Sequence, residues 1–156
     1  QLMVLKGATT ELIANDALDL SIFIIDNLGL DTSSIAIQMY SEAELMMIQN
    51  KYNDAISQLD KIIKLFPGHV LVDNILMKKA EIYFIQKEYI QVETMLLKLL
   101  QSFSADVLAD NAIFMLAELY DYQLNEKVKA KSCYEKIILD YSNSVFLVDA
   151  RKAIRD

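Results

Sequence analysis

The sequence predicts an all-α fold, a right-handed superhelical stack of antiparallel helix pairs. The first observation is a tripeptide on a fixed pitch: Ala43-Glu44-Leu45, Ala80-Glu81-Ile82 and Ala117-Glu118-Leu119 follow one another at intervals of 37 residues. The second is that apolar residues inside each interval recur every three or four positions, which places them on one side of an α-helix. Self-similarity on such a pitch is typical of units that bury their apolar faces by stacking on one another.

Each repeat is expected to contain two helices joined by a tight turn. In the first regular repeat, one apolar stripe ends at Gln49-Asn50. A second stripe runs from Tyr52 to Phe66, and Pro67-Gly68 ends it. The small alanine of the tripeptide suits the point where the two helices cross. The pattern predicts first helices at about 32–49, 70–86 and 105–123, and second helices at about 51–66, 88–103 and 126–141.

The whole chain, residues 1–156, is expected to form a single domain. Its 54% content of apolar residues is enough to bury a continuous core, and three Gly and one Pro leave few places for long loops. The domain is expected to consist of an irregular unit at about 1–30, regular repeats at about 31–67, 68–104 and 105–142, and a C-terminal helix at about 144–155.

Two departures from strict repetition are visible. Leu18, Ile22 and Ile25 stand one repeat interval before the apolar stripe of a second helix, so a part-helical first unit is expected over 1–28. In the third regular repeat the second stripe arrives one residue late. We expect the loop around Leu124-Asn125 to be one residue longer than its counterparts.

The pattern resembles the tetratricopeptide repeat family, whose unit of about 34 residues has a small residue in the first helix, an aromatic three positions later, an aromatic near the turn, Ala opening the second helix and Pro at its end. The resemblance covers roughly residues 31–142, and it departs in lacking Trp, in keeping a single Pro and in running three residues longer. The longer unit resembles that of bacterial envelope-associated relatives, of the Bacteroidetes type. In the second repeat the family positions are occupied by Ala80, Tyr83, Tyr89, Val92 and Ser104.

The resemblance implies a concave groove lined by the first helices and an outer wall formed by the second helices. Such a groove would be acidic and aromatic here, with one glutamate per repeat, and would suit a protein or peptide that bears basic and apolar residues. Glutamate is also a good helix former, so a solvated helix surface is the alternative for this row. The groove positions are Tyr40, Glu44, Met47, Met77, Glu81, Phe84, Asn111, Phe114, Glu118, Asp121 and Tyr122.

Other classes of protein are disfavoured by composition. A net charge of −7 would repel phosphate backbones, so no nucleic-acid partner is expected. Cys133 is the only cysteine and His69 the only histidine, which argues against a disulfide, a metal site and a catalytic constellation. The longest apolar stretches, such as Ile22-Phe23-Ile24-Ile25, fall short of the ~20 residues that a transmembrane helix requires. We expect no enzyme activity, no catalytic residue and no cofactor.

Two functions remain open from the sequence. The first is a non-enzymatic scaffold that binds a partner segment in the concave groove, as part of a bacterial envelope assembly. The alternative is a structural or oligomerisation segment of a longer array, in which the apolar ends at Leu2-Met3-Val4-Leu5 and Phe146-Leu147-Val148 stack on further repeats or self-associate. Because the chain begins at Gln1, it is interpreted as a fragment, and the compartment stays open, with the periplasm or envelope favoured over the cytoplasm.

Overall fold

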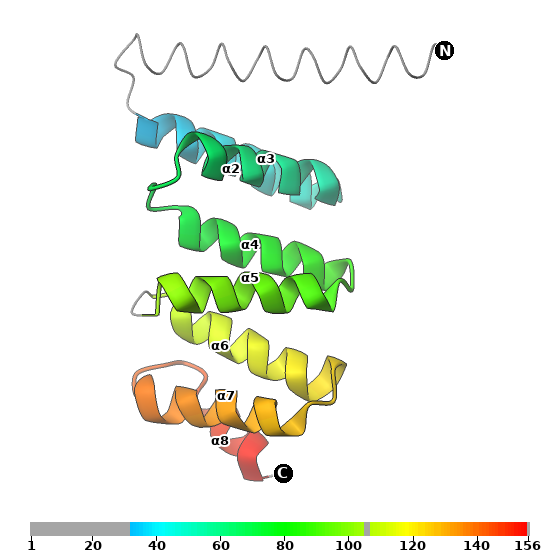
Figure 1. Cartoon of the computed structure of the whole chain (residues 1–156), viewed down its shortest axis with the longest axis vertical. Helices are drawn as coiled ribbons and strands as arrows, with labels where there is room; N and C mark the ends of the chain where they lie inside the picture. Colours follow the sequence, from blue (N-terminus) through cyan, green and yellow to red (C-terminus); the bar gives the residue numbers. More distant parts are fainter. Residues whose placement is uncertain (1–31, 105–106, 156) are drawn as a thin grey trace.

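The computed structural model describes residues 32–104 and 107–155. In these ranges every regular element is helical and no β-strand occurs. The helices stack along one long axis, with α2 at one end and α8 at the other (Figure 1). The elements in chain order are α2 (Thr32–Ile48), α3 (Tyr52–Leu65), α4 (Val72–Ile85), α5 (Tyr89–Ser102), α6 (Ala109–Glu118), the π-helical segment η1 (Leu119–Gln123), α7 (Lys127–Asp140) and α8 (Leu147–Arg155).

The expected helices are confirmed to within a few residues at each boundary. The first and second helices of each repeat are α2 and α3, α4 and α5, then α6 with η1 and α7. The C-terminal helix begins slightly later than predicted, at Leu147, because Val145 and Phe146 form a turn. In that turn the Phe146 N–H donates a hydrogen bond to Ser144 Oγ at 3.2 Å. The irregular unit expected over 1–28 lies outside the described residues.

The first two helix-to-helix turns share one geometry. Asn50 and Lys87 adopt left-handed backbone angles, with φ of 59° and 63°. The next N–H, that of Lys51 or of Glu88, donates to the carbonyl five residues back, at 2.9 Å in both turns. This is the hydrogen bond of a Schellman motif, which caps the helix carbonyls and turns the chain sharply into the second helix.

The extra residue of the third repeat lies in a helix, and the expectation of a longer loop was wrong. Asn125 is the left-handed residue of this turn, with φ of 54°, and Lys127 opens α7 two residues later, as Tyr52 and Tyr89 do after their own left-handed residues. The extra residue is accommodated in η1, where the Leu124 N–H donates to the carbonyl of Leu119, five residues back, at 3.0 Å. A π-helical turn is a single-residue insertion into an α-helix, and it preserves the capping turn that follows.

The core follows the repeat. Ala43, Ala80 and Ala117 have exposed fractions of 1%, 0% and 0%, so the expectation that Ala80 and Ala117 are buried is confirmed. Helix α4 links successive repeats, because Ile75 and Ile82 belong to the apolar cluster around α2 and α3, while its other face belongs to the cluster that continues to α8. Each repeat is therefore stabilised by its neighbours along the stack.

Candidate functional site

All of the expected groove residues lie on first helices. Glu118 and Tyr122 are exposed, and the others are half-buried. The half-buried methionine and aromatic side chains of this set pack against the two apolar core clusters and leave only part of their surface accessible. The set is distributed over α2 (Tyr40, Glu44, Met47), α4 (Met77, Glu81, Phe84), α6 (Asn111, Phe114, Glu118) and η1 (Asp121, Tyr122).

A first cavity, which we call the N-terminal pocket, opens between α2 and α4. Its volume is about 480 Å³. The aliphatic side chains at its rim are accessible, with Ile48 77% exposed and Ile85 48% exposed. The Tyr52 hydroxyl donates a hydrogen bond of 2.7 Å to Asn50 Oδ1, so these two polar groups of the pocket wall are paired with each other. The pocket is lined by Glu44, Met47, Ile48, Asn50, Tyr52, Lys78 and Ile85.

A lysine that sequence reasoning missed is shared between Glu44, which lines this pocket, and Glu81 beside it. Lys78 Nζ lies 2.9 Å from a Glu81 carboxylate oxygen and 3.7 Å from one of Glu44. Burial lowers the pKa of Lys78, but the hydrogen bond to Glu81 and the nearby acids outweigh it and raise the pKa overall. Lys78 stands three residues before Glu81 on one helix, a spacing that could have indicated this pair. The link to Glu44 required the stacking of α4 on α2.

A second cavity, which we call the C-terminal pocket, opens between α6 and α8 and has a volume of about 350 Å³. It brings together the carboxylates of Glu118 and Asp149. Burial raises the pKa of the Glu118 carboxyl, and the charge of Asp149 raises it further. The lining residues are Phe114, Glu118, Tyr122, Tyr134, Asp149, Lys152 and Ala153.

One expected groove aromatic also holds the last helix in place. The Phe114 ring stacks on Phe146, in the turn before α8, with ring centroids 4.3 Å apart and planes 11° apart. It also meets the edge of Tyr134 at 6.1 Å. Tyr122, by contrast, is 67% exposed. Tyr122 is therefore the aromatic of this region that is most open to a partner.

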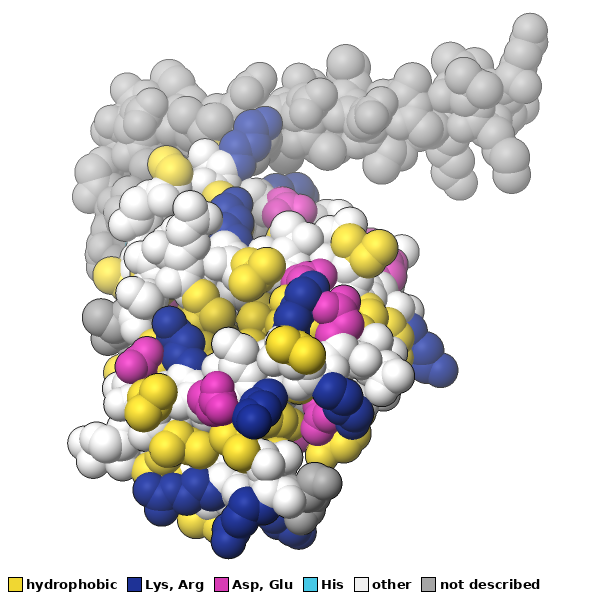
Figure 2. All heavy atoms as spheres, turned by 60° about the horizontal axis from the view of Figure 1, so that its bottom comes forward, with side chains coloured by type: hydrophobic (Ala, Val, Ile, Leu, Met, Phe, Trp, Pro, Cys, Tyr) yellow, Lys and Arg dark blue, Asp and Glu magenta, His cyan; other side chains and the backbone are white. Residues whose placement is uncertain are grey.

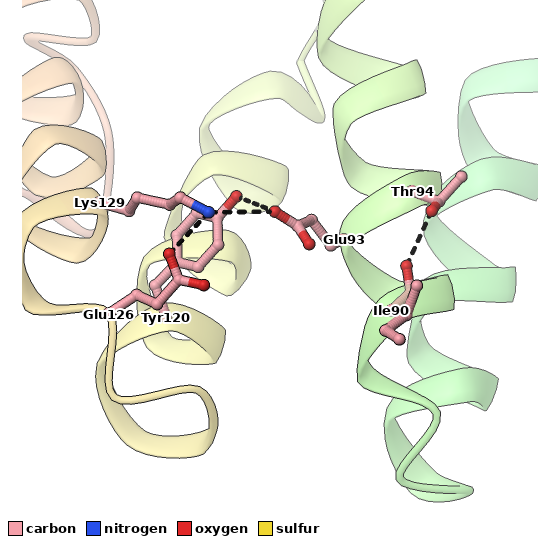
Figure 3. A network of polar contacts seen from close by, with 6 residues as sticks. All are labelled: Ile90, Glu93, Thr94, Tyr120, Glu126 and Lys129. Carbon is pink, nitrogen blue, oxygen red and sulfur yellow. Dashed lines mark hydrogen bonds and ion pairs between the residues drawn. The ribbon is translucent and has the colours of Figure 1, made fainter.

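A polar network joins the second and third regular repeats away from both pockets (Figure 3). The Tyr120 hydroxyl of η1 donates a 2.5 Å hydrogen bond to Glu93 on α5. Lys129 of α7 lies 2.6 Å from Glu126, 3.9 Å from Glu93 and 5.0 Å from the centre of the Tyr120 ring. Burial, followed by the bond to Glu93, raises the pKa of Tyr120. Sequence reasoning missed this network because its members come from separate elements.

Cys133 and His69, the only cysteine and the only histidine of the sequence, lie in surroundings typical of structural residues. Cys133 is half-buried, and burial raises the pKa of its thiol, which disfavours a nucleophilic thiolate. His69 accepts a 3.2 Å hydrogen bond from the Leu71 N–H through Nδ1, within the turn between α3 and α4. Among the described residues, no group of three or more His, Cys, Asp or Glu side chains is arranged to hold a metal ion. None of the described helices has the length and apolar character of a membrane span.

The α8 end of the molecule is basic on its surface. Figure 2, in which this end is turned forward, shows lysine and arginine side chains gathered there, whereas acidic and basic side chains alternate over the middle of the stack. Arg151, Lys152 and Arg155 of α8 are exposed, and Ala150 is buried against the preceding repeat. Helix α8 therefore has one apolar side, which packs on the preceding repeat, and one charged side, which faces outward.

Comparison with known proteins agrees with this architecture. Residues 111–144 match the tetratricopeptide repeat family. Among solved structures, the N-terminal domain of stress-induced protein-1 (STI-1) from C. elegans is similar, with a TM-score of 0.65 and 16% sequence identity, over 80% of this chain and 98% of that one. The sequence matches no curated protein. The chain thus has the fold of a tetratricopeptide-type α-solenoid.

Proposed function

We propose that this chain is a non-enzymatic scaffold that binds an extended or helical segment of a partner protein along its first helices. The observation that carries the proposal is the pair of pockets between successive first helices, one between α2 and α4 and the other between α6 and α8. Pockets at the two ends of one helix series suit a segment that runs across the repeats and places a side chain in each.

The N-terminal pocket supports an apolar anchor on the partner. Met47, Ile48 and Ile85 line it, and Lys78 compensates the charge of Glu44 there. Methionine side chains are flexible and repack around apolar groups of differing shape. A buried apolar or aromatic anchor can contribute about 2 kcal/mol or more to binding, whereas an exposed ion pair adds roughly 0.2–1 kcal/mol. Most of the affinity at this pocket is therefore expected from apolar contact.

Site-specific photo-crosslinking in the full chain tests which face binds. A photoreactive phenylalanine analogue is placed at Met47 or Tyr122 on the first helices, and, as matched controls, at the exposed apolar positions Leu97 on α5 and Leu139 on α7. The proposal expects partner crosslinks from the first-helix positions. Crosslinks that form only from Leu97 and Leu139, in protein that remains folded, contradict it.

We further propose that the scaffold acts in a bacterial envelope assembly. The support is the 37-residue pitch, which resembles that of envelope-associated tetratricopeptide proteins. Fractionation of source cells, with detection of the natural full-length protein, tests this location. Recovery of the protein in the cytoplasmic fraction alone, with envelope markers elsewhere, would exclude it.

A second candidate function, stacking on further repeats, is favoured by exposed apolar side chains at the α8 end. Val145 is 81% exposed in the turn before α8, and Val148 is 74% exposed on α8. Light scattering of the full chain and of Val148→Glu compares this candidate with the scaffold. A higher oligomer that Val148→Glu converts to monomer supports self-stacking, and a monomer in both excludes it.

A further inference from the structure

The N-terminal pocket lies at a junction that recurs one repeat later in the same chain. One of its wall residues is Met47 near the end of α2, and the counterpart one interval along is Phe84 near the end of α4. Another is Tyr52, the first residue of α3, whose counterpart is Tyr89, the first residue of α5. Because the units of a repeat stack are built alike, the second junction shows what the first one lacks.

The second junction contains a pair of aromatic rings. Phe84 and Tyr89 are arranged edge to face, with ring centroids 5.9 Å apart and planes at 61°. Both side chains pack against the apolar cluster that continues to α8. The Tyr89 hydroxyl donates a hydrogen bond of 2.9 Å to Gln123 Oε1 in η1, so this tyrosine also reaches the following first helix. The junction is therefore closed by an aromatic pair and by a hydrogen bond across it.

The first junction has neither feature. Met47 stands in the place of the phenylalanine ring, and the Tyr52 hydroxyl donates to Asn50 in its own turn. Here the cavity of about 480 Å³ opens between α2 and α4, and the ring of Tyr52 is the only one among its lining residues. The N-terminal pocket is thus the position at which Tyr52 lacks the aromatic neighbour that Tyr89 has.

The chemistry of the lining suits a neutral aromatic group. The sulfur of a methionine such as Met47 makes favourable contacts with aromatic rings, and a tyrosine ring pairs edge to face with another ring. The charged residues of the lining are Glu44 and Lys78, one of each sign, with Lys78 Nζ 3.7 Å from a Glu44 carboxylate oxygen. A charged side chain would have to compete with this ion pair, whereas a neutral ring leaves it intact. The volume is within the range of ligand pockets.

We propose that the N-terminal pocket binds an aromatic side chain of the partner protein, whose ring lies beside Tyr52 as the ring of Phe84 lies beside Tyr89. This inference rests on the proposed scaffold function and deepens it, because it narrows the apolar anchor at this pocket to an aromatic one. An aliphatic anchor would fill the same space without the edge-to-face contact.

The test uses defined probes and needs no identified partner. The full chain is labelled with ¹⁵N and titrated with Nα-acetyl-phenylalanine amide, and then with the cyclohexylalanine analogue, whose saturated ring has the same number of carbon atoms. Dissociation constants are compared, because an aromatic ring shifts nearby resonances by itself. We expect saturable shifts of amides in α2, α4 and the start of α3, and about two- to tenfold weaker binding of the saturated probe. Equal or tighter binding of the saturated probe, or shifts confined to other helices, overturns the inference.

A variant borrowed from the second junction sharpens the test. Met47→Phe gives α2 the residue that α4 has, and we expect its ring to occupy the pocket and to weaken probe binding at least about tenfold. Ile90→Phe, which adds a ring at a position of α5 that is 78% exposed, is the matched control and is expected to leave the affinity unchanged. Unchanged probe affinity in folded Met47→Phe refutes the site.

A second variant keeps the test decisive if Met47→Phe does not fold. Ile48→Ser shortens an apolar wall residue that is 77% exposed, so the fold is expected to persist. We expect the phenylalanine probe to bind several-fold more weakly to this variant, because apolar contact with the ring is lost. An affinity equal to that of the unmodified chain would again refute the site.

The failure of this inference is distinguishable from failure of the scaffold function. If the partner crosslinks from Tyr122 while Met47→Phe leaves its affinity unchanged, the scaffold function stands and the aromatic anchor is wrong. If the phenylalanine probe binds but no partner crosslinks to the first helices, the scaffold function is wrong, and so is the assignment of the pocket to a partner. Crosslinks from Met47 to another part of this chain, or to a second copy of it, identify a different occupant and also overturn the inference.

Discussion

At the scale of single residues, the alanine at the helix crossing limits how closely the two helices of a pair approach. Ala117 is fully buried between α6 and its neighbours. Ala117→Leu overpacks this crossing, and we expect it to lower the free energy of unfolding by ~1–3 kcal/mol. The midpoint of urea denaturation measures this. Val128→Leu, at a position 86% exposed on α7, is expected to leave the midpoint unchanged. An unchanged midpoint for Ala117→Leu would show that this crossing is loosely packed.

The Tyr120 hydroxyl is a second group with a defined energetic role. It donates a short hydrogen bond to the Glu93 carboxylate, and the ring lies under Lys129. Tyr120→Phe keeps the ring and removes the bond, so we expect a loss of about 1.5–3 kcal/mol of stability. Tyr83→Phe, at the equivalent position one repeat earlier, is the matched control, because the Tyr83 hydroxyl makes no hydrogen bond among the described residues. A loss of the same size in both variants would rule out a specific contribution from the bond to Glu93.

At the scale of elements, η1 shows how a repeat accommodates an insertion. The extra residue widens the end of the first helix, and the Glu126 N–H still caps that helix by donating to the Tyr120 carbonyl at 2.7 Å. We expect deletion of the exposed Tyr122 to convert the π-helical turn to an α-helical one with a small change in melting temperature. Deletion of Phe84, at the end of α4 where no extra residue exists, is expected to displace the following turn and to lower the melting temperature far more. Equal decreases in melting temperature for the two deletions would mean that η1 tolerates the loss of a residue no better than α4 does.

The contacts that hold α8 on the rest of the stack are a second feature at the scale of elements. Phe146 stacks on Phe114, and Ala150 is fully buried, while the rest of the helix is largely exposed. Phe146→Ala removes the stack, which is worth ~0.5–1.5 kcal/mol beyond the buried area. We expect amide hydrogen exchange in α8 to accelerate while α4 and α5 keep their protection, because helices at the end of a stack open locally. Uniform acceleration along the chain would show a single cooperative unit instead.

At the scale of the whole molecule, four buried or half-buried tyrosines make the stack sensitive to alkaline pH. In each of these tyrosines the pKa of the hydroxyl is raised above its ordinary value, and burial is the largest cause of the increase. A tyrosine whose pKa is higher in the folded state stabilises the fold below its unfolded pKa, about 10, and this stabilisation is lost as pH rises through the folded value. We expect the urea midpoint to fall above pH ~10, and to fall less in Tyr120→Phe. A midpoint that is constant to pH ~11 would contradict this. The tyrosines are Tyr40, Tyr120, Tyr134 and Tyr141.

The fold and the identity of the site-bearing helices followed from the sequence alone. A pitch of 37 residues and apolar stripes of helical period predicted the helices from α2 to α8 and the burial of Ala80 and Ala117. This was possible because helical periodicity is a local property, set by about 3.6 residues per turn, and because each repeat confirms the register of the next. The same register assigned the groove positions to first helices.

Only the tertiary structure decided which of the groove glutamates have their negative charge compensated by a nearby cation. Lys78 on α4 pairs with Glu44 on α2, and Phe146, in the turn before α8, covers Phe114 on α6. The sequence presented three equivalent glutamates. Stacking gave Glu44 and Glu81 a shared cation and placed Glu118 beside Asp149 instead. Charge compensation depends on distances of a few ångströms between helices, and these distances are set by how the repeats pack rather than by spacing along the chain.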